Sequence, residues 1–119
     1  MLDPEIVDSL EIISNSIEIV NNRYGYLQKM GIPVDSELGI TFLDSIAIHL
    51  LLIGEKTKDL DRKNPGLLAR HGIDPQPVIR TRDFLSHHYE RVDYASIVEI
   101  CNIDLPELGT KIKAMIGEV

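Results

Sequence analysis

Apolar residues recur along the first thirty positions at alternating spacings of four and three. The series is Ile6, Leu10, Ile13, Ile17, Val20, Tyr24 and Leu27. Such spacing places one apolar stripe along an α-helix. Asp3 is a favourable N-cap residue, Pro4 suits the first helical position, and Gly31 marks a turn. The pattern therefore predicts an amphipathic helix that begins at Pro4 and ends near Met30.

A second helix is predicted from Asp35 or Ser36 to about Leu60, after the turn Gly31-Ile-Pro33. Its middle is apolar on several faces, whereas one stripe would be enough for the core of a small domain. Two interpretations remain open: a subunit interface, or a central helix surrounded by its own chain. The longest apolar run, Ile46 to Ile53, is too short to span a bilayer, so no membrane association is expected.

The second half of the chain predicts a long loop followed by three more helices. Residues 61–77, rich in Pro and Gly, read as the loop, and the third helix begins near Pro77. Asp93 can cap a short helix from Tyr94 to about Cys101. Asp104 and Glu107 resemble a capping box, so a last helix is predicted to begin there. Leu108, Ile112 and Met115 are expected to face inward on this helix. No segment alternates as a strand does. We therefore predict an all-α, up-and-down bundle of four main helices plus a short one, forming one domain over residues 1–119.

Composition narrows the class of protein. The chain has 119 residues, 44% of them hydrophobic, and no Trp, so one aliphatic core is expected. Acidic residues near the start argue against a secretory signal. Cys101 is the one cysteine and reads as a small buried residue of a reduced protein. No Cys/His cluster has the spacing of a zinc site. These features predict a cytoplasmic protein without a metal or other cofactor.

Charge is distributed unevenly along the chain. The net charge is -7, yet residues 56–91 hold eight of the twelve cations and five of the nineteen acids. This segment carries +3 and the remainder -10. The low pI argues against a general nucleic-acid coat, but a local basic surface suits a phosphate-bearing ligand. A solvated loop and helix face would produce the same charge pattern.

The stretch "RTRDFLSHHYERVDY", residues 80–94, concentrates polar groups on a predicted helix. At about 100° per residue from Arg82, Ser86 lies near 40°, Asp83 near 100°, His87 near 140° and Tyr89 near 340°. These five side chains share one face of the helix. Asp83 and His87 are four residues apart on it, close enough for the carboxylate to orient the imidazole.

The other residues of the stretch fall on the opposite side of the predicted helix. Phe84, Leu85 and His88 lie there, so the two adjacent histidines face different ways. His88 is expected to act as a packing residue, and His87 is the candidate for chemistry.

An Arg and a His on one helix face can carry out phosphate chemistry without a metal. A guanidinium binds phosphate in a bidentate manner and keeps its charge. An imidazole exchanges a proton near neutral pH. In RNA the 2'-hydroxyl is a built-in nucleophile, so a base and a cation suffice for strand cleavage. The spacing alone also fits a surface salt-bridge network.

The motif in its context resembles a known family. Arg82-Asp83-x3-His87-x-Tyr89 is similar to the R-x4-H-x-Y motif of the HepT toxins, which belong to the HEPN superfamily. The length, the helix order, the "IGEKTKDL" end of the second helix and the final "DLPEL" helix are similar as well. Many relatives have Asn where this chain has Asp83. Either histidine fits the looser superfamily pattern, and the His-x-Tyr ending selects His87.

The resemblance implies a HEPN fold that forms a two-fold dimer and acts as a metal-independent ribonuclease. It implies Arg82 and His87 as catalytic residues and Asp83 as a supporting position. It further implies neutralisation by an MntA-type minimal nucleotidyltransferase antitoxin, which transfers AMP to Tyr89.

A dimer would supply both a base and an acid for in-line cleavage, because its two-fold axis brings two motif helices around one cleft. Ser86 would support the site, and Arg62, Lys63, Arg70 and Arg80 would guide the RNA backbone. The main alternative is a non-catalytic helical adaptor that binds a nucleotidyltransferase. A purely structural interaction protein would leave the polar face unexplained.

Overall fold

The computed structural model describes residues 2–87 and 93–117. These residues form helices α1 (Pro4–Lys29), α2 (Glu37–Lys63), α3 (Leu67–Arg70), α4 (Gln76–His87), α5 (Tyr94–Glu99), the π-helix η2 (Ile100–Asp104) and α6 (Leu105–Ile116). Within them there is no β-strand. The predicted all-α fold is confirmed.

Helix α1 begins and ends as the sequence predicts. The Asp3 carboxylate accepts a hydrogen bond of 2.8 Å from the Glu5 amide, and Pro4 occupies the first helical position. Met30 caps the C-terminus, and Gly31 follows with a φ of 64°, a left-handed conformation that favours glycine. The predicted stripe faces the core: Ile6 is half-buried and its six partners, from Leu10 to Leu27, are buried.

Helix α2 begins as predicted but ends later. The Ser36 hydroxyl accepts a hydrogen bond of 3.0 Å from the Gly39 amide. The helix runs on to Lys63, past the predicted end at Leu60, and α3 lies inside the segment 61–77 that we had predicted to be loop. That prediction was wrong because polar residues such as Asp61 and Arg62 continue the outer face of a helix without an apolar signal.

Residues 94–116 form one continuous helical path through α5, η2 and α6. Asp93 caps α5 as predicted, accepting hydrogen bonds from the amides of Ala95 (3.1 Å) and Ser96 (3.4 Å). The predicted capping box at Asp104 is wrong. Asp104 has helical dihedrals and no side-chain cap, because the π-helix η2 joins α5 to α6 without a break. Leu108, Ile112 and Met115 nevertheless face inward as predicted.

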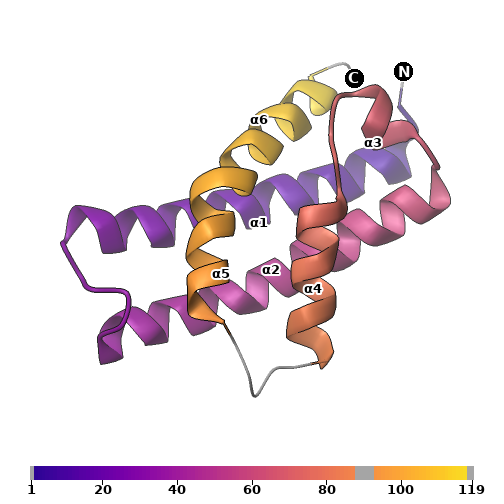
Figure 1. The fold of residues 1–119 in the computed structure, drawn as a ribbon. Coiled ribbons are helices and arrows are strands. Elements are labelled where there is room, and N and C mark those ends of the chain that lie inside the picture. Colours follow the sequence, from indigo (N-terminus) through magenta and orange to yellow (C-terminus); the bar gives the residue numbers. More distant parts are fainter. Residues whose placement is uncertain (1, 88–92, 118–119) are drawn as a thin grey trace.

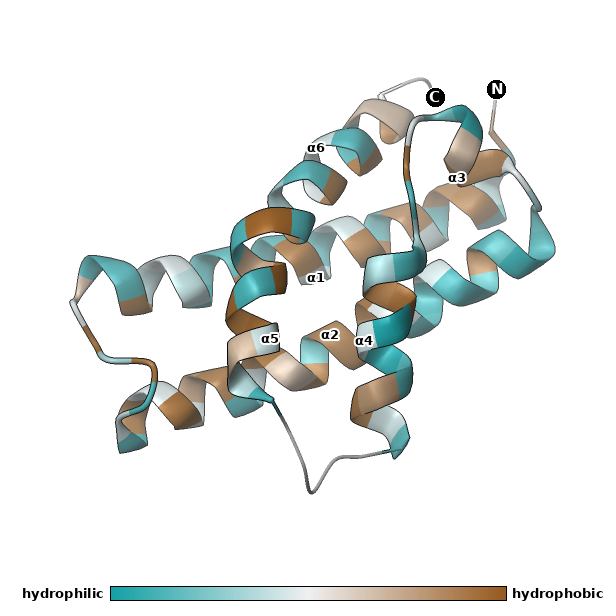
Figure 2. Ribbon diagram, in the orientation of Figure 1, coloured by the Kyte–Doolittle hydropathy of each residue, from teal (hydrophilic) through white to brown (hydrophobic). Residues whose placement is uncertain are grey.

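The helices form two layers. Helices α1 and α2 lie side by side as a long antiparallel pair, and α4, α5 and α6 cover one face of it (Figure 1). Brown hydrophobic residues recur along each long helix, and teal hydrophilic residues separate them (Figure 2). The core is aliphatic, with Leu, Ile and Val as its main components. Cys101 is buried within it, and burial raises the pKa of its thiol to about 12, which fits the predicted packing role.

Helix α2 is long and apolar enough to cross a membrane by length and composition alone, unlike the short run considered above. In this structure it contacts α1, α4 and α5, as a central bundle helix does. Some of its apolar residues stay exposed, among them Ile48 at 61% and Leu38 at 52%. The molecule therefore keeps an uncovered apolar surface on α2.

Candidate functional site on helix α4

Helix α4 carries the motif and packs mainly on α2. The Asp74 carboxylate accepts a hydrogen bond of 3.0 Å from the Gln76 amide, which satisfies an unpaired donor at the first turn. Val78 and Leu85 are buried at 2% exposure and Ile79 at 8%, and they anchor the helix to the core. Arg82, Asp83 and His87 therefore lie on a helix that is anchored at its first turn and by buried residues on both sides of Arg82.

Gly54 of α2 lets α4 approach at the site of Arg82. A Cβ atom added at Gly54 would lie 2.2 Å from Arg82 Cβ and 2.9 Å from the Val78 carbonyl oxygen. Any side chain at position 54 would therefore push the two helices apart. The stem of Arg82 is held in this contact, and its side chain is 24% exposed. Sequence reasoning did not identify Gly54, although an isolated glycine inside a helical pattern is a recognised sign of close packing.

The guanidinium of Arg82 is tied to a carboxylate that two cations share. Arg82 Nη1 donates to Asp83 Oδ1 at 3.0 Å, and Lys58 Nζ of α2 donates to the same oxygen at 3.2 Å. The hydrogen bonds from Arg82 and then from Lys58 hold the pKa of Asp83 below its usual value. Asp83 thus gathers two positive charges at one point on the surface.

Lys58 was not among the predicted site residues. It lies one turn after Gly54, on the same face of α2, so the i, i+4 spacing was a signal that could have identified it.

His87 and Ser86 lie exposed in the last turn of α4. The expected orientation of His87 by Asp83 is not found: within residues 2–87 and 93–117, no hydrogen bond joins the two side chains, and Asp83 is engaged by Arg82 and Lys58 instead. Tyr89 and His88 lie outside the described residues. The structure thus brings Arg82, Asp83 and Lys58 together, with His87 one turn beyond Asp83.

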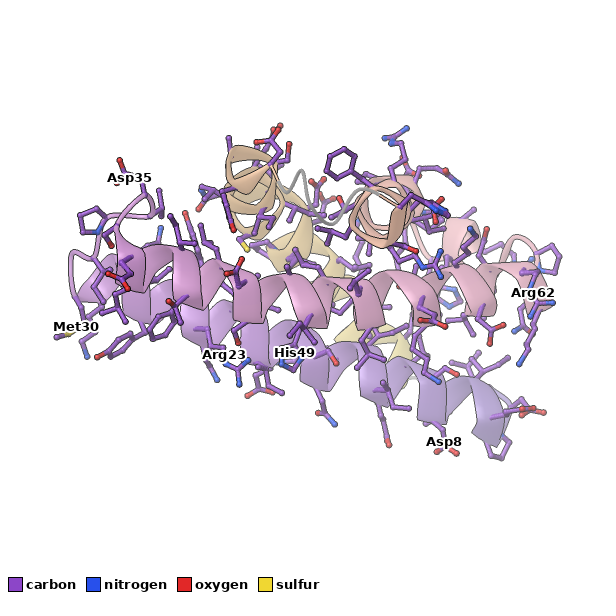
Figure 3. All side chains as sticks on the ribbon, turned by 90° about the horizontal axis from the view of Figure 1, so that it is seen from below. Asp8, Arg23, Met30, Asp35, His49 and Arg62 are labelled. Atoms are coloured by element: carbon purple, nitrogen blue, oxygen red, sulfur yellow. The ribbon has the colours of Figure 1, made fainter. Side chains whose placement is uncertain are left out.

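The predicted RNA-guiding cations are spread over three elements. Arg62 and Lys63 lie in the last turn of α2 and pair with Asp59 at 2.6 Å and 3.1 Å. Arg62 follows Lys58 by one turn, and both line a shallow depression of about 350 Å³. Arg62 is labelled near one end of α2 in Figure 3. Arg70 ends α3 and is exposed, and Arg80 lines a groove between α4 and α5.

The exposed apolar surface of α2 does not border the motif. Leu52 precedes Gly54 by two residues, which places it about 200° away around the helix. In Figure 3, His49 lies beside Arg23 of α1, on the side away from α4 and α5. The apolar face of α2 and the motif face of α4 are therefore separate surfaces.

In the part of the chain that the structure describes, no group of three His, Cys, Asp or Glu side chains could hold a metal ion. The chemistry that the site offers is that of a fixed guanidinium, a neighbouring ammonium group and an exposed imidazole.

Comparison with known proteins agrees with the family resemblance. Searches of curated proteins and of solved structures gave no match. A family model described as ribonuclease HepT-like matches residues 39–115, from the first turns of α2 to the last turn of α6. The match covers most of the chain and includes the whole of α4, and α1 lies outside it. The chain therefore belongs to the family of HepT-like ribonucleases.

Proposed function

We propose that the protein is the ribonuclease toxin of a toxin–antitoxin system and works as one domain in the cytoplasm. The single observation that carries this is Arg82, fixed against Gly54 and paired with Asp83, with His87 exposed one turn further along α4. This is a phosphate-binding cation beside a group that can transfer a proton. Membership of a ribonuclease family supports the same chemistry.

In the proposed reaction Arg82 binds the scissile phosphate of RNA. Its guanidinium neutralises the charge that develops on the phosphate oxygens, and Lys58 adds a second positive charge. Asp83 keeps both cations in place until the phosphate arrives. His87 accepts the proton of the 2'-hydroxyl, whose oxygen attacks phosphorus and forms a cyclic phosphate. The 5'-oxygen leaves and takes a proton from a general acid. Ser86, beside His87, would support the site by hydrogen bonding. No metal ion takes part in these steps.

The general acid is proposed to come from a second copy of the chain. One α4 helix supplies one motif histidine, and a homodimer whose two-fold axis lies near α4 supplies the other. This arrangement joins the motif faces and leaves the apolar face of α2 outside the site. Sedimentation at micromolar concentration should give twice the 13.4 kDa mass of the chain. A fully active monomer would refute the shared site.

RNA is proposed to follow the cations that surround the motif. Lys58 and Arg62 line one depression on α2, Lys63 follows Arg62 in the last turn of this helix, and Arg70 ends α3. Arg80 lies on the other side of α4. Backbone contacts of this kind carry little sequence information, and their strength falls with added salt.

The proposed regulator is an MntA-type nucleotidyltransferase that adds AMP to Tyr89. A phosphate on this residue, seven positions after Arg82, would compete for the guanidinium and repel incoming RNA. Intact mass after incubation with such a partner, ATP and magnesium should show adenylyl groups on the wild type and none on Tyr89→Phe. Equal modification of Tyr89→Phe would place the switch elsewhere.

Expression in a bacterial host tests the central proposal. Arg82→Ala and His87→Ala should each abolish growth arrest and slow RNA cleavage in vitro by roughly 10²- to 10⁴-fold. His88→Ala, the neighbouring histidine, and Lys113→Ala, an exposed cation on α6, are the matched controls and should keep activity. Cleavage by the wild type should continue in excess EDTA.

A wild-type protein that binds a nucleotidyltransferase but neither stops growth nor cuts RNA would identify an adaptor. An inactive His88→Ala with an active His87→Ala would show that the assignment of the catalytic histidine is wrong.

A further inference from the structure

The carboxylate of Asp83 lies at a point where two helices each supply a cation. Arg82 of α4 and Lys58 of α2 donate to the same oxygen atom, Asp83 Oδ1, at 3.0 Å and 3.2 Å. Helices α2 and α4 lie against each other here (Figure 1). The hydrogen bond from Arg82, and then that from Lys58, lowers the pKa of Asp83, so the group is an anion at neutral pH. One negatively charged oxygen is therefore shared by two positive groups.

A phosphate oxygen would bind to the same two cations in the same way. Carboxylate and phosphate oxygens are both anionic acceptors of the hydrogen bonds that guanidinium and ammonium groups donate. The Asp83 oxygen already lies within hydrogen-bond distance of Arg82 Nη1 and Lys58 Nζ, where a phosphate oxygen would have to bind. The charge of the carboxylate also cancels one of the two positive charges. Asp83 therefore opposes RNA both by position and by charge.

Of the three side chains, Asp83 is the one that can give way. The stem of Arg82 is packed against Gly54, and the Arg82 side chain is only 24% exposed. The side chains of Asp83 and Lys58 are 40% and 50% exposed and extend into solvent. A short carboxylate side chain changes its direction by rotation between staggered positions about one bond. We therefore expect RNA to reach Arg82 by displacing Asp83 and not by drawing Arg82 outward.

We propose that Asp83 is a stand-in for phosphate, whose carboxylate binds Arg82 and Lys58 in the free protein and is displaced by the scissile phosphate of RNA. This inference rests on the proposed function. It assigns Lys58 a direct contact with that phosphate, and it makes Asp83 a residue that lowers RNA affinity. An RNA strand held by further phosphate contacts displaces the carboxylate more readily than a lone anion does, because the strand raises the local phosphate concentration.

The first test measures binding of a 2'-O-methyl RNA oligonucleotide, which resists cleavage because the attacking hydroxyl is blocked. Asp83→Asn keeps the size of the side chain and removes its charge. This variant should bind the oligonucleotide roughly 2- to 30-fold more tightly than the wild type, as expected when two exposed ion pairs no longer compete with RNA. In cleavage of unmodified RNA, KM should fall by a similar factor while kcat stays the same.

The salt dependence of binding gives a readout that a merely supporting role for Asp83 would not change. In the wild type, the displaced carboxylate takes up a cation from solution, which offsets one of the counterions that RNA releases. Asp83→Asn has no carboxylate to displace. The plot of log binding constant against log salt concentration should therefore be steeper for Asp83→Asn, by up to about 0.7.

Two variants separate this local effect from a general effect of charge. Lys58→Met, added to Asp83→Asn, should remove most of the gain in affinity because the second cation is then lost. Glu107→Gln removes an equal charge on α6 and breaks an ion pair of 2.9 Å with Lys111. It should bind RNA like the wild type. Circular dichroism checks that each variant is folded.

Inorganic phosphate tests the anion site without RNA. A ligand that binds the folded state raises its melting temperature. Phosphate should therefore raise the melting temperature of Asp83→Asn more than that of the wild type, and Lys58→Met should remove the difference.

Several results would overturn the inference. Weaker RNA binding by Asp83→Asn would show that the carboxylate supports Arg82 throughout the reaction. The same gain in Glu107→Gln would show that net charge alone is responsible. If the wild type cuts RNA and Asp83→Asn gains affinity for neither RNA nor phosphate, the stand-in is refuted and the nuclease stands. If the wild type neither binds nor cuts RNA, the proposed function fails, and the phosphate measurement alone decides whether Asp83 occupies an anion site.

Discussion

At the scale of single residues, Gly54 decides where the guanidinium of Arg82 lies. Gly54→Ala would place a methyl group within 2.2 Å of Arg82 Cβ, so α2 and α4 must separate. Overpacking of this kind costs about 1–3 kcal/mol. Because displacement of a binding group also impairs catalysis, we expect RNA cleavage to fall roughly 10- to 100-fold. Thermal unfolding and cleavage rates measure the two effects.

Gly25 provides the matched control for this substitution. It also lies inside a long helix, α1, but a Cβ atom there would meet nothing within 4 Å. Gly25→Ala should therefore stabilise the protein by about 0.5–1 kcal/mol and leave cleavage unchanged. If both variants behave alike, the close approach of α4 to Gly54 is not what positions Arg82.

At the scale of elements, Asp93 and Asp104 were both predicted to cap a helix, but only Asp93 does so. Asp93 caps α5 through two backbone amides, whereas Asp104 caps nothing. Burial, and then repulsion from Glu99, raises the pKa of Asp104, so its ionised form is disfavoured in the folded state. We expect Asp93→Ala to lower the free energy of unfolding by about 1 kcal/mol. Asp104→Asn should leave it unchanged or slightly higher at pH 7. Urea unfolding distinguishes the two, and an equal loss would restore Asp104 as a cap.

The same elements show what periodicity can predict. Apolar spacing predicted the inward faces of α1 and α6, because burial is what produces that spacing. The third helix was predicted from its start near Pro77, and α4 (Gln76–His87) carries Arg82, Asp83 and His87. Apolar spacing could not predict where α2 ends or that η2 bridges α5 and α6. These boundaries depend on backbone hydrogen bonds that polar residues make as readily as apolar ones.

The pairing of Asp83 with Lys58 was not predicted from the sequence. Lys58 and Asp83 are 25 residues apart, and their contact exists because α2 and α4 meet at Gly54. A pattern along one helix places Asp83 and His87 on a shared face. It does not show that Lys58 of α2 lies close enough to bind the Asp83 carboxylate. The contact between α2 and α4 therefore determines that Asp83 pairs with Arg82 and Lys58 rather than with His87.

At the scale of the whole molecule, the pairing of α1 with α2 leaves a polar group unsatisfied. Arg23 of α1 donates a hydrogen bond of 2.7 Å to Ser45 of α2, and His49 lies close by (Figure 3). His49 Nδ1 is buried without a hydrogen-bond partner among the described residues. Burial, and then the charge of Arg23, lowers the pKa of His49 below its usual value. The folded protein therefore favours the neutral imidazole.

This shift predicts how stability depends on pH. The unfolded chain binds a proton at His49 near its ordinary pKa of about 6.5, whereas the folded protein resists protonation until the pH is lower. Stability should therefore fall as the pH drops below about 6.5 and stop falling, for this group, once the folded pKa is passed. His49→Gln removes the titrating ring, so its melting temperature should decline less between pH 7 and pH 5 than that of the wild type. Parallel declines in the two proteins would show that the junction between α1 and α2 does not disfavour the charged imidazole.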